Sequence, residues 1–77
     1  MSMATRANAN DRDIQLARYI QEIRKQKGYT QEQLADKIGV SLTHYSYLEI
    51  GYKLPNTHML QRIADALEVK VKELIPF

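Results

Sequence analysis

The chain contains no cysteine, and no apolar run approaches the length of a membrane-spanning helix. Without cysteine, a disulfide framework and most structural zinc sites are excluded, and nothing in the composition argues for secretion. No signal-peptide hydrophobic region is present either. We therefore expect a cytoplasmic protein with no membrane partner.

Groups that carry catalysis or bind metals are also scarce. The only histidines are His44 and His58, and neither lies in a metal-ligand spacing such as HExxH. Ser41, Ser46 and the histidines form no recognised nucleophile motif. A chain of 77 residues also leaves little room for a deep substrate pocket. We expect no enzyme activity, no metal site and no cofactor.

The length of the chain allows one domain, preceded by a short tail. Residues 1–12, MSMATRANANDR, are small and polar without apolar periodicity, which predicts a disordered N-terminal tail. Residues 13–77 then form the folded domain, which is close to the lower size limit for a domain that is stable without disulfides or a bound metal. The net charge of +2 and the pI near 9.0 fit a DNA-binding protein, but they also fit many small basic domains with other roles.

Apolar residues recur at helical spacing along the domain, and no segment alternates as a strand would. Gly28, Gly39 and Gly51 mark the ends of the first three helices, and Asn56 or Thr57 can cap the fourth. The predicted fold class is therefore all-α, with five short helices packed around one core. The expected helices span residues 13–26, about 30–38, 41–50, about 56–67 and 70–74.

The most informative segment is TQEQLADKIGVSLTHYSYLE, residues 30–49, which has the layout of a helix-turn-helix. Thr30 followed by Gln33 is a capping box, in which each side chain bonds a free backbone N–H of the other residue. Gly39 can adopt the positive φ that ends a helix abruptly, and Ser41 can cap the next helix. The facing apolar side chains are Leu34, Ala35 and Ile38 on the first helix, and Tyr45 and Leu48 on the second.

The outward side of that second helix carries no charged residue. At about 100° per residue, this face is made of Leu42, Thr43, Ser46, Tyr47 and Ile50. A helix that is merely exposed to water normally carries lysine, arginine or glutamate there. Hydroxyls, methyls and an aromatic ring instead indicate a contact surface, although an ordinary helical hairpin with an unremarkable polar face is the alternative.

Several short motifs follow one another in the order and spacing of a known family. The motifs are Gly-Tyr-Thr-Gln at 28–31, Leu34-Ala35, Gly39-Val40-Ser41, Leu48-Glu49 followed by Gly51 and Pro55, and Ile63-Ala64-x-Ala66-Leu67. With these motifs, the chain from about Leu16 to Leu74 resembles the Xre-type regulators, the family of the lambdoid phage repressors and Cro. The resemblance implies a compact lambda-repressor-like domain and a sequence-specific regulator, typically a repressor, that binds double-stranded DNA.

The resemblance assigns roles to individual residues, which we state as expectations. Arg24 and Glu49 would form a partly buried salt bridge that fixes the recognition helix, the alternative being two separate solvated charges. Base-reading positions are Leu42, Thr43, Ser46 and Tyr47, and phosphate-binding positions are Gln31, Tyr52 and Lys53. Plain surface exposure is the alternative for Gln31, and packing on Ile50 is the alternative for Tyr47.

The chain departs from the family pattern at several positions. Tyr45 stands where a β-branched aliphatic residue is usual, which predicts a recognition helix set slightly farther out. Ile50 replaces a frequent asparagine, and Thr57 stands where helix four usually begins with an apolar residue. The reading face has no Arg, Gln or Asn, so bidentate pairing to guanine or adenine is not available from this helix. Specificity would then depend on thymine methyl contacts, hydroxyl bonds and DNA shape.

Two further expectations concern partners. The apolar C-terminal residues Leu74, Ile75 and Phe77 would form a homodimer interface, as in family members that pair around a two-fold axis. Such a dimer would bind a near-palindromic operator, whereas the alternative is that these side chains fold back onto the protomer's own core. A second functional hypothesis is an antitoxin or protein-interaction module, which uses the same neutral helix-turn-helix surface to bind a protein partner.

Overall fold

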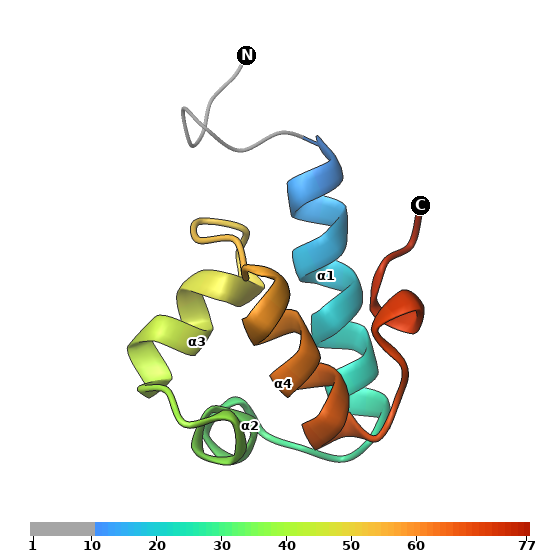
Figure 1. The fold of residues 1–77 in the computed structure, drawn as a ribbon. Coiled ribbons are helices and arrows are strands. Elements are labelled where there is room, and N and C mark those ends of the chain that lie inside the picture. The colour runs from blue at the N-terminus through green and yellow to red at the C-terminus, as the bar shows by residue number, and fades with distance from the viewer. Residues whose placement is uncertain (1–10) are drawn as a thin grey trace.

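The computed structural model describes residues 11–77, which form four α-helices followed by a short 3-10 helix (Figure 1). The all-α fold class is confirmed, with the difference that the fifth helix is a single 3-10 turn. No described helix is both long and apolar enough to cross a membrane. The elements are α1 (Asp11–Gln26), α2 (Gln31–Ile38), α3 (Leu42–Glu49), α4 (Thr57–Leu67) and η1 (Val71–Leu74).

The first helix begins earlier than the sequence predicted. Asp11 and Arg12 already belong to α1, so the boundary expected after residue 12 is corrected, and the rest of the expected tail lies outside the described residues. Asp11 and Asp13 both fall in the first turn, where negative charge interacts favourably with the positive end of the helix dipole. This local electrostatic preference extends the helix towards the N-terminus.

Each of the helices α2, α3 and α4 begins at a side-chain cap. Thr30 and Gln33 form both bonds of the expected capping box, with N–O distances of 3.0 Å and 2.9 Å. The Ser41 hydroxyl accepts a bond of 3.0 Å from the backbone N–H of His44. For α4 the cap is Asn56, whose side-chain oxygen lies 2.8 Å from the backbone nitrogen of Met59. Thr57 is the first helical residue.

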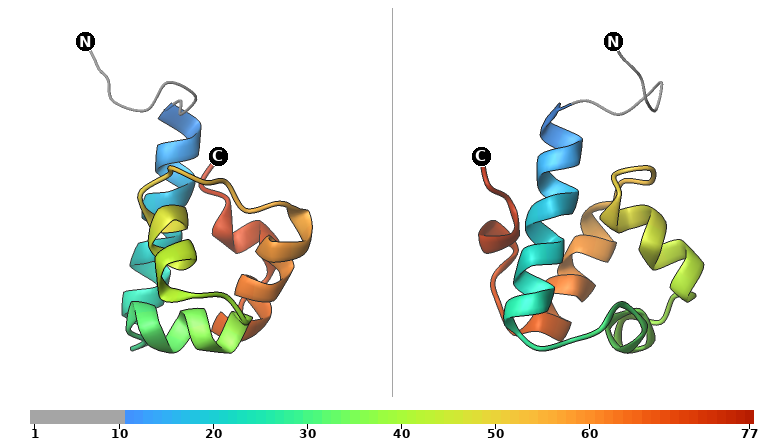
Figure 2. Two further views of the ribbon diagram at one scale, coloured as in Figure 1. Left: turned by 90° about the vertical axis from the view of Figure 1, so that its left-hand side faces the viewer. Right: turned by 180° about the vertical axis from the view of Figure 1, so that it is seen from behind.

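The helices enclose the core so that α3 lies at an outer edge of the molecule. Figure 1 shows α4 between α3 and α1, with α2 running beneath them. The right-hand view in Figure 2 agrees that α3 forms a border of the fold, and that the C-terminal segment lies beside α1 on the opposite side from α3. Among residues 11–77, no other helix covers the outer face of α3.

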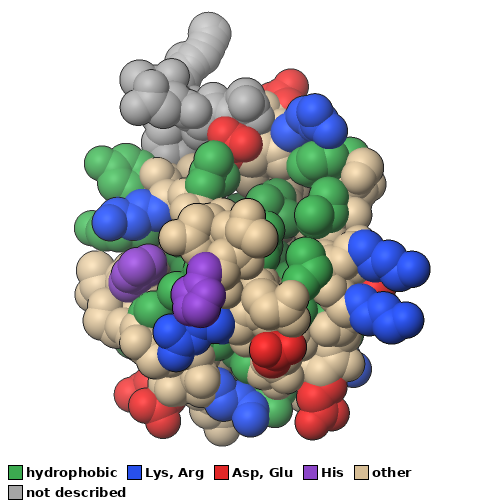
Figure 3. Space-filling view, in the orientation of Figure 1, with side chains coloured by type: hydrophobic (Ala, Val, Ile, Leu, Met, Phe, Trp, Pro, Cys, Tyr) green, Lys and Arg blue, Asp and Glu red, His purple; other side chains and the backbone are tan. Residues whose placement is uncertain are grey.

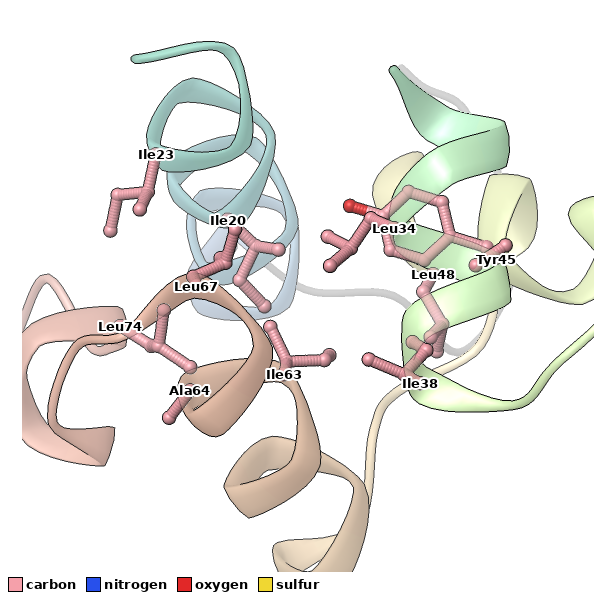
Figure 4. Close-up of a cluster of buried hydrophobic side chains, with 11 residues drawn as sticks. Ile20, Ile23, Leu34, Ile38, Tyr45, Leu48, Ile63, Ala64, Leu67 and Leu74 are labelled. Atoms are coloured by element: carbon pink, nitrogen blue, oxygen red, sulfur yellow. The ribbon is translucent and has the colours of Figure 1, made fainter. Parts of the chain in front are cut away.

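The core brings the helix-turn-helix against α1 and α4 (Figure 4). Tyr45, Leu34 and Ile38 face Ile20 and Ile63 across the centre of the cluster, and none of them exposes more than 2% of its surface. Burial of this apolar surface stabilises the fold and fixes α2 and α3 onto the other helices. The remaining buried members are Ile23, Ala35, Leu48, Ala64, Leu67 and Leu74.

Leu74 corrects one expectation about the C-terminus. Its side chain is fully buried in the protomer's own core, so it has no surface left to contribute to a dimer interface. The 3-10 turn of η1 directs Leu74 inward, while Ile75 is half-buried and Phe77 keeps 53% of its surface exposed. The guanidinium of Arg12 lies 4.2 Å from the centre of the Phe77 ring, and this cation–π contact joins the two ends of the described chain.

Candidate nucleic-acid interface

The turn between α2 and α3 is set by Gly39. Its φ of 79° is left-handed, and its backbone N–H ends α2 by bonding the carbonyl of Asp36 at 3.2 Å. A Cβ atom added at Gly39 would lie 2.9 Å from a side-chain nitrogen of Arg62. Glycine is favoured here by the left-handed backbone conformation, whereas the flexible end of the Arg62 side chain from α4 can move aside for a Cβ.

The outward face of α3 is exposed and uncharged, as predicted. Leu42 and Tyr47 expose 45% and 39% of their surface, Thr43 is exposed and Ser46 is half-buried. Ile50, the residue that follows the helix, is 53% exposed. The structure thus presents methyls, hydroxyls and one aromatic ring together at the outer edge of the fold.

The predicted salt bridge between Arg24 and Glu49 is confirmed. Arg24 Nε lies 2.5 Å from Glu49 Oε2 and Nη2 lies 3.3 Å from Oε1, so the contact is bidentate. Arg24 Nη1 also donates to the backbone carbonyl of Tyr29 at 2.6 Å. Because the pair is buried, it fixes the C-terminal end of α3 to α1, and breaking it would leave an uncompensated charge.

Two further side chains donate to the same carboxylate, and no pattern in the sequence indicates either contact. The hydroxyl of the buried Tyr45 donates to Glu49 Oε2, and Gln31 Nε2 donates to Glu49 Oε1 at 2.8 Å. On the outer side, the Ser46 hydroxyl donates to Gln31 Oε1 at 3.3 Å. We call Arg24, Glu49, Tyr45, Gln31 and Ser46 the Glu49 network.

The protonation states within the Glu49 network follow from burial and hydrogen bonding. Burial alone would raise the pKa of Glu49, but the bonds from Arg24, Tyr45 and Gln31 outweigh it and lower that pKa below its usual range. Burial, together with the bond to Glu49, raises the pKa of Tyr45. Burial lowers the pKa of Arg24, but the hydrogen bond and charge of Glu49, together with Tyr45, outweigh burial, so the pKa of Arg24 is raised. At neutral pH the network therefore holds an ionised carboxylate, a guanidinium and a neutral phenol.

The loop after α3 lies directly against the reading face. The backbone carbonyl of Tyr47 accepts bonds from the N–H groups of Tyr52 and Lys53, at 3.0 Å and 3.2 Å. The Tyr47 and Tyr52 rings pack with their centres 5.1 Å apart and their planes tilted by 56°. Tyr47 therefore packs on Tyr52, and the exposed Lys53 is held next to the recognition helix.

Positive charge near this face is sparse. Lys53 is the only lysine or arginine between Lys37 and Arg62 in the sequence. Figure 3 shows acidic and basic side chains scattered over the face that carries α3 and α4, with no large cluster of one sign. Within residues 11–77, no group of three or more acidic or histidine side chains is placed to hold a metal ion. The arrangement fits a surface that binds by shape and hydrogen bonding, with a few charged contacts at its border.

Comparison with known proteins identifies the family. A model of the helix-turn-helix family HTH_3 matches residues 20–74. The chain belongs to the HTH_3 family. YazB of Bacillus subtilis (strain 168), an HTH-type transcriptional regulator, is 41% identical over 59 residues, which cover 77% of this chain and 86% of YazB. The predicted class, a DNA-binding transcriptional regulator, is confirmed at the level of the family.

Other proteins similar to this chain are regulators of several kinds. The phage CTXphi transcriptional repressor RstR of Vibrio cholerae is 51% identical over 51 residues, which cover 66% of this chain and 46% of RstR. The chain thus spans about half of the length of RstR. The biofilm regulator SinR, solved in complex with DNA, superimposes with a TM-score of 0.71 at 32% identity, over 77% of this chain and 95% of SinR. The restriction–modification controller C.AhdI of Aeromonas hydrophila gives 0.77 at 26% identity, over 80% and 94% of the two chains.

Proposed function

We propose that this HTH_3 domain binds duplex DNA sequence-specifically, with α3 in the major groove, and acts as a transcriptional repressor. The observation that carries the proposal is the exposed, uncharged face of α3 at the outer edge of the fold, fixed from behind by the Glu49 network. An α-helix presented in this way fits the width of the major groove. SinR, a relative of the same fold, is described in complex with DNA, which supports the proposal.

In this proposal each outward side chain of α3 contacts a different group on the DNA. The hydroxyls of Thr43 and Ser46 bond base edges, Leu42 contacts a thymine methyl or the sugar–phosphate edge, and the Tyr47 ring packs on a thymine methyl. Bidentate pairs, each worth about 1–3 kcal/mol of discrimination, are absent from this face. DNA shape and deformability therefore contribute a large share of the specificity.

The phosphate contacts come from the two borders of the same surface. Lys53 and Tyr52 in the loop after α3 bind the backbone on one side, and the N-terminus of α2 at Gln31 binds it on the other. The Gln31 amide already donates one hydrogen to Glu49, and the backbone N–H of Gln33 bonds Thr30. The second N–H of the Gln31 amide and the other backbone N–H groups of the first turn are therefore the donors proposed for a phosphate.

We further propose that the domain binds DNA as a homodimer through Ile75 and Phe77. The half-buried Ile75 and the exposed Phe77 lie together at the C-terminal end, on the opposite side of the fold from α3. A dimer that contacts successive major grooves on one side of the duplex requires two recognition helices about 34–36 Å apart, which corresponds to half-sites separated by about 10–10.5 bp in a near-palindromic operator.

The proposal is tested by selecting bound sequences from a random duplex library and measuring affinity for the selected operator at several salt concentrations. Affinity should fall steeply between about 50 and 200 mM salt, because phosphate contacts release counterions. A library that yields no enriched sequence, or an affinity that does not change with salt, would contradict sequence-specific DNA binding.

A second candidate function rests on the apolar side chains at the C-terminal end of α3 and in the loop that follows. Tyr47, Ile50, Tyr52 and Leu54 each expose between 39% and 59% of their surface. Such a patch also fits a protein partner, as in an antitoxin that holds a toxin. Binding of a protein partner that is insensitive to salt, with no duplex DNA affinity, would favour this candidate.

A further inference from the structure

The Glu49 network controls which way the Ser46 hydroxyl points. An ionised carboxylate has no hydrogen to donate, so the amide of Gln31 must turn its nitrogen towards Glu49, at 2.8 Å. The oxygen of the same amide then faces Ser46, whose Oγ lies 3.3 Å away. Because an amide oxygen only accepts, the single hydrogen of the Ser46 hydroxyl points inward.

We propose that Ser46 acts towards DNA only as a hydrogen-bond acceptor, and therefore reads an exocyclic amine in the major groove, the N6 amine of adenine or the N4 amine of cytosine. A serine hydroxyl normally rotates and matches donors and acceptors alike. Here its hydrogen is held by Gln31, so only its lone pairs face outward. The inference rests on the proposed insertion of α3 into the major groove.

The orientation of Gln31 is fixed by what lies behind it. Glu49 exposes 5% of its surface and is held by both Arg24 and Tyr45, so it cannot turn away from Gln31. Flipping the Gln31 amide would set its oxygen against a carboxylate oxygen and its nitrogen against Ser46. That arrangement places two acceptors together in a partly buried site, which is strongly unfavourable. Gln31 is thus a positioning residue, and Ser46 is the residue that meets the base.

Ser46 is placed to meet a base edge. It is half-buried, while Leu42 and Thr43, one helical turn before it, are exposed on the same face of α3. The Ser46–Gln31 bond is the longest of the Glu49 network at 3.3 Å, together with the Arg24 Nη2 contact. Because this bond is long, the orientation of the Ser46 hydroxyl by Gln31 is the part of the inference that most needs an experimental test.

The first stage finds the base pair that Ser46 contacts. Operators are selected from a random duplex library with the wild-type chain, with Ser46→Ala, and with Thr43→Val as a matched control that removes a different hydroxyl from the same face. We expect one position in each half-site to lose its base preference in Ser46→Ala and to keep it in Thr43→Val.

The second stage determines which group on that pair is read, because every base pair carries both donors and acceptors in the major groove. If the base is adenine, 2-aminopurine moves its amine to the minor groove, and if it is cytosine, 2-pyrimidinone removes the amine. Loss of the amine should weaken DNA binding by the wild-type chain by about 2- to 10-fold per half-site, which is the contribution of one hydrogen bond. The affinity of Ser46→Ala should not change when the amine is lost. A 7-deazapurine in the same pair, which lacks only an acceptor, should affect both chains equally.

The third stage tests the positioning role of Gln31. Gln31→Met keeps the length of the side chain but removes the oxygen that holds the Ser46 hydrogen. The preference at the Ser46 position should relax while the rest of the selected operator is retained, and thermal unfolding confirms that the variant is folded. A preference at that position unchanged in Gln31→Met, or an acceptor rather than an amine coupled to Ser46, would overturn the inference alone. Failure of the wild-type chain to enrich any sequence would overturn it together with the proposed function.

Discussion

Removing the hydroxyl of Tyr45 is the sharpest test of the Glu49 network as the support of the recognition helix. Tyr45 is fully buried and its hydroxyl donates to the ionised carboxylate of Glu49. Hydrogen bonds to charged groups contribute about 1.5–3 kcal/mol to stability. Tyr45→Phe keeps the ring in the core and loses only this bond, so we expect the free energy of unfolding to fall by that amount.

Thermal unfolding followed by circular dichroism measures this loss. In a domain of this size each kcal/mol shifts Tm by about 4–8 °C, so Tyr45→Phe should lower Tm by about 6–24 °C. Tyr47→Phe is the matched control, because it removes a hydroxyl from an exposed tyrosine of the same helix and should stay within about 0.5 kcal/mol of wild type. Equal Tm values for the two variants would refute the idea that the hydroxyl of Tyr45 stabilises Glu49.

The same variant has a defined pH dependence. The pKa of Glu49 is lowered in the folded protein, so its stabilising contribution is present above the pKa of an unfolded glutamate, about 4.3. That contribution is lost as the pH falls through the lower folded value. Tyr45→Phe removes one of the bonds that lower this pKa. The stability difference from wild type should be full at pH 7 and should shrink in acid, and a difference that grows in acid would contradict the assignment.

The remaining predictions address the interface and the C-terminus. Lys53→Ala should weaken binding to operator and random DNA about equally. It should also reduce the slope of log affinity against log salt concentration by about one per protomer, which titrations at several salt concentrations would measure. Tyr47→Ala should weaken operator DNA by about 1–3 kcal/mol per half-site and random DNA less, in competition binding assays. Leu74→Ala should lower the free energy of unfolding, measured with denaturant, by about 2–5 kcal/mol, because it leaves a cavity at a fully buried position. Phe77→Ala should weaken dimerisation, measured by sedimentation, and leave the free energy of unfolding almost unchanged.

The parts of the fold that depend on neighbouring residues were predictable from the sequence. The capping box of Thr30 and Gln33, the left-handed Gly39 and the cap at Ser41 all appear where their spacing placed them. Each of these features is decided within four residues of chain, where backbone geometry leaves few alternatives. The start of α1 was missed because the polar residues before Asp13 carry no apolar periodicity.

Contacts between distant residues were predicted less well. The pairing of Arg24 with Glu49 came from the family resemblance, since no spacing rule joins residues 25 positions apart. The phosphate contact expected of Gln31 stays a prediction, but the bonds of its side chain to Glu49 and Ser46 were not foreseen, because a sequence does not rank the competing partners of one amide. Leu74 has the same apolar character whether it faces its own core or a second copy, and only the three-dimensional packing distinguishes the two.

The most direct test of the central claim is an NMR structure of the domain bound to its selected operator. If α3 lies in the major groove, the methyl protons of Leu42 and the ring protons of Tyr47 should show intermolecular contacts with thymine methyl groups, which project into that groove. The amide signals of Thr43 and Ser46 should shift on binding, while those near Phe77 should not respond to DNA in a preformed dimer. Contacts from α3 only to minor-groove protons, or no contact between α3 and DNA at all, would contradict the account.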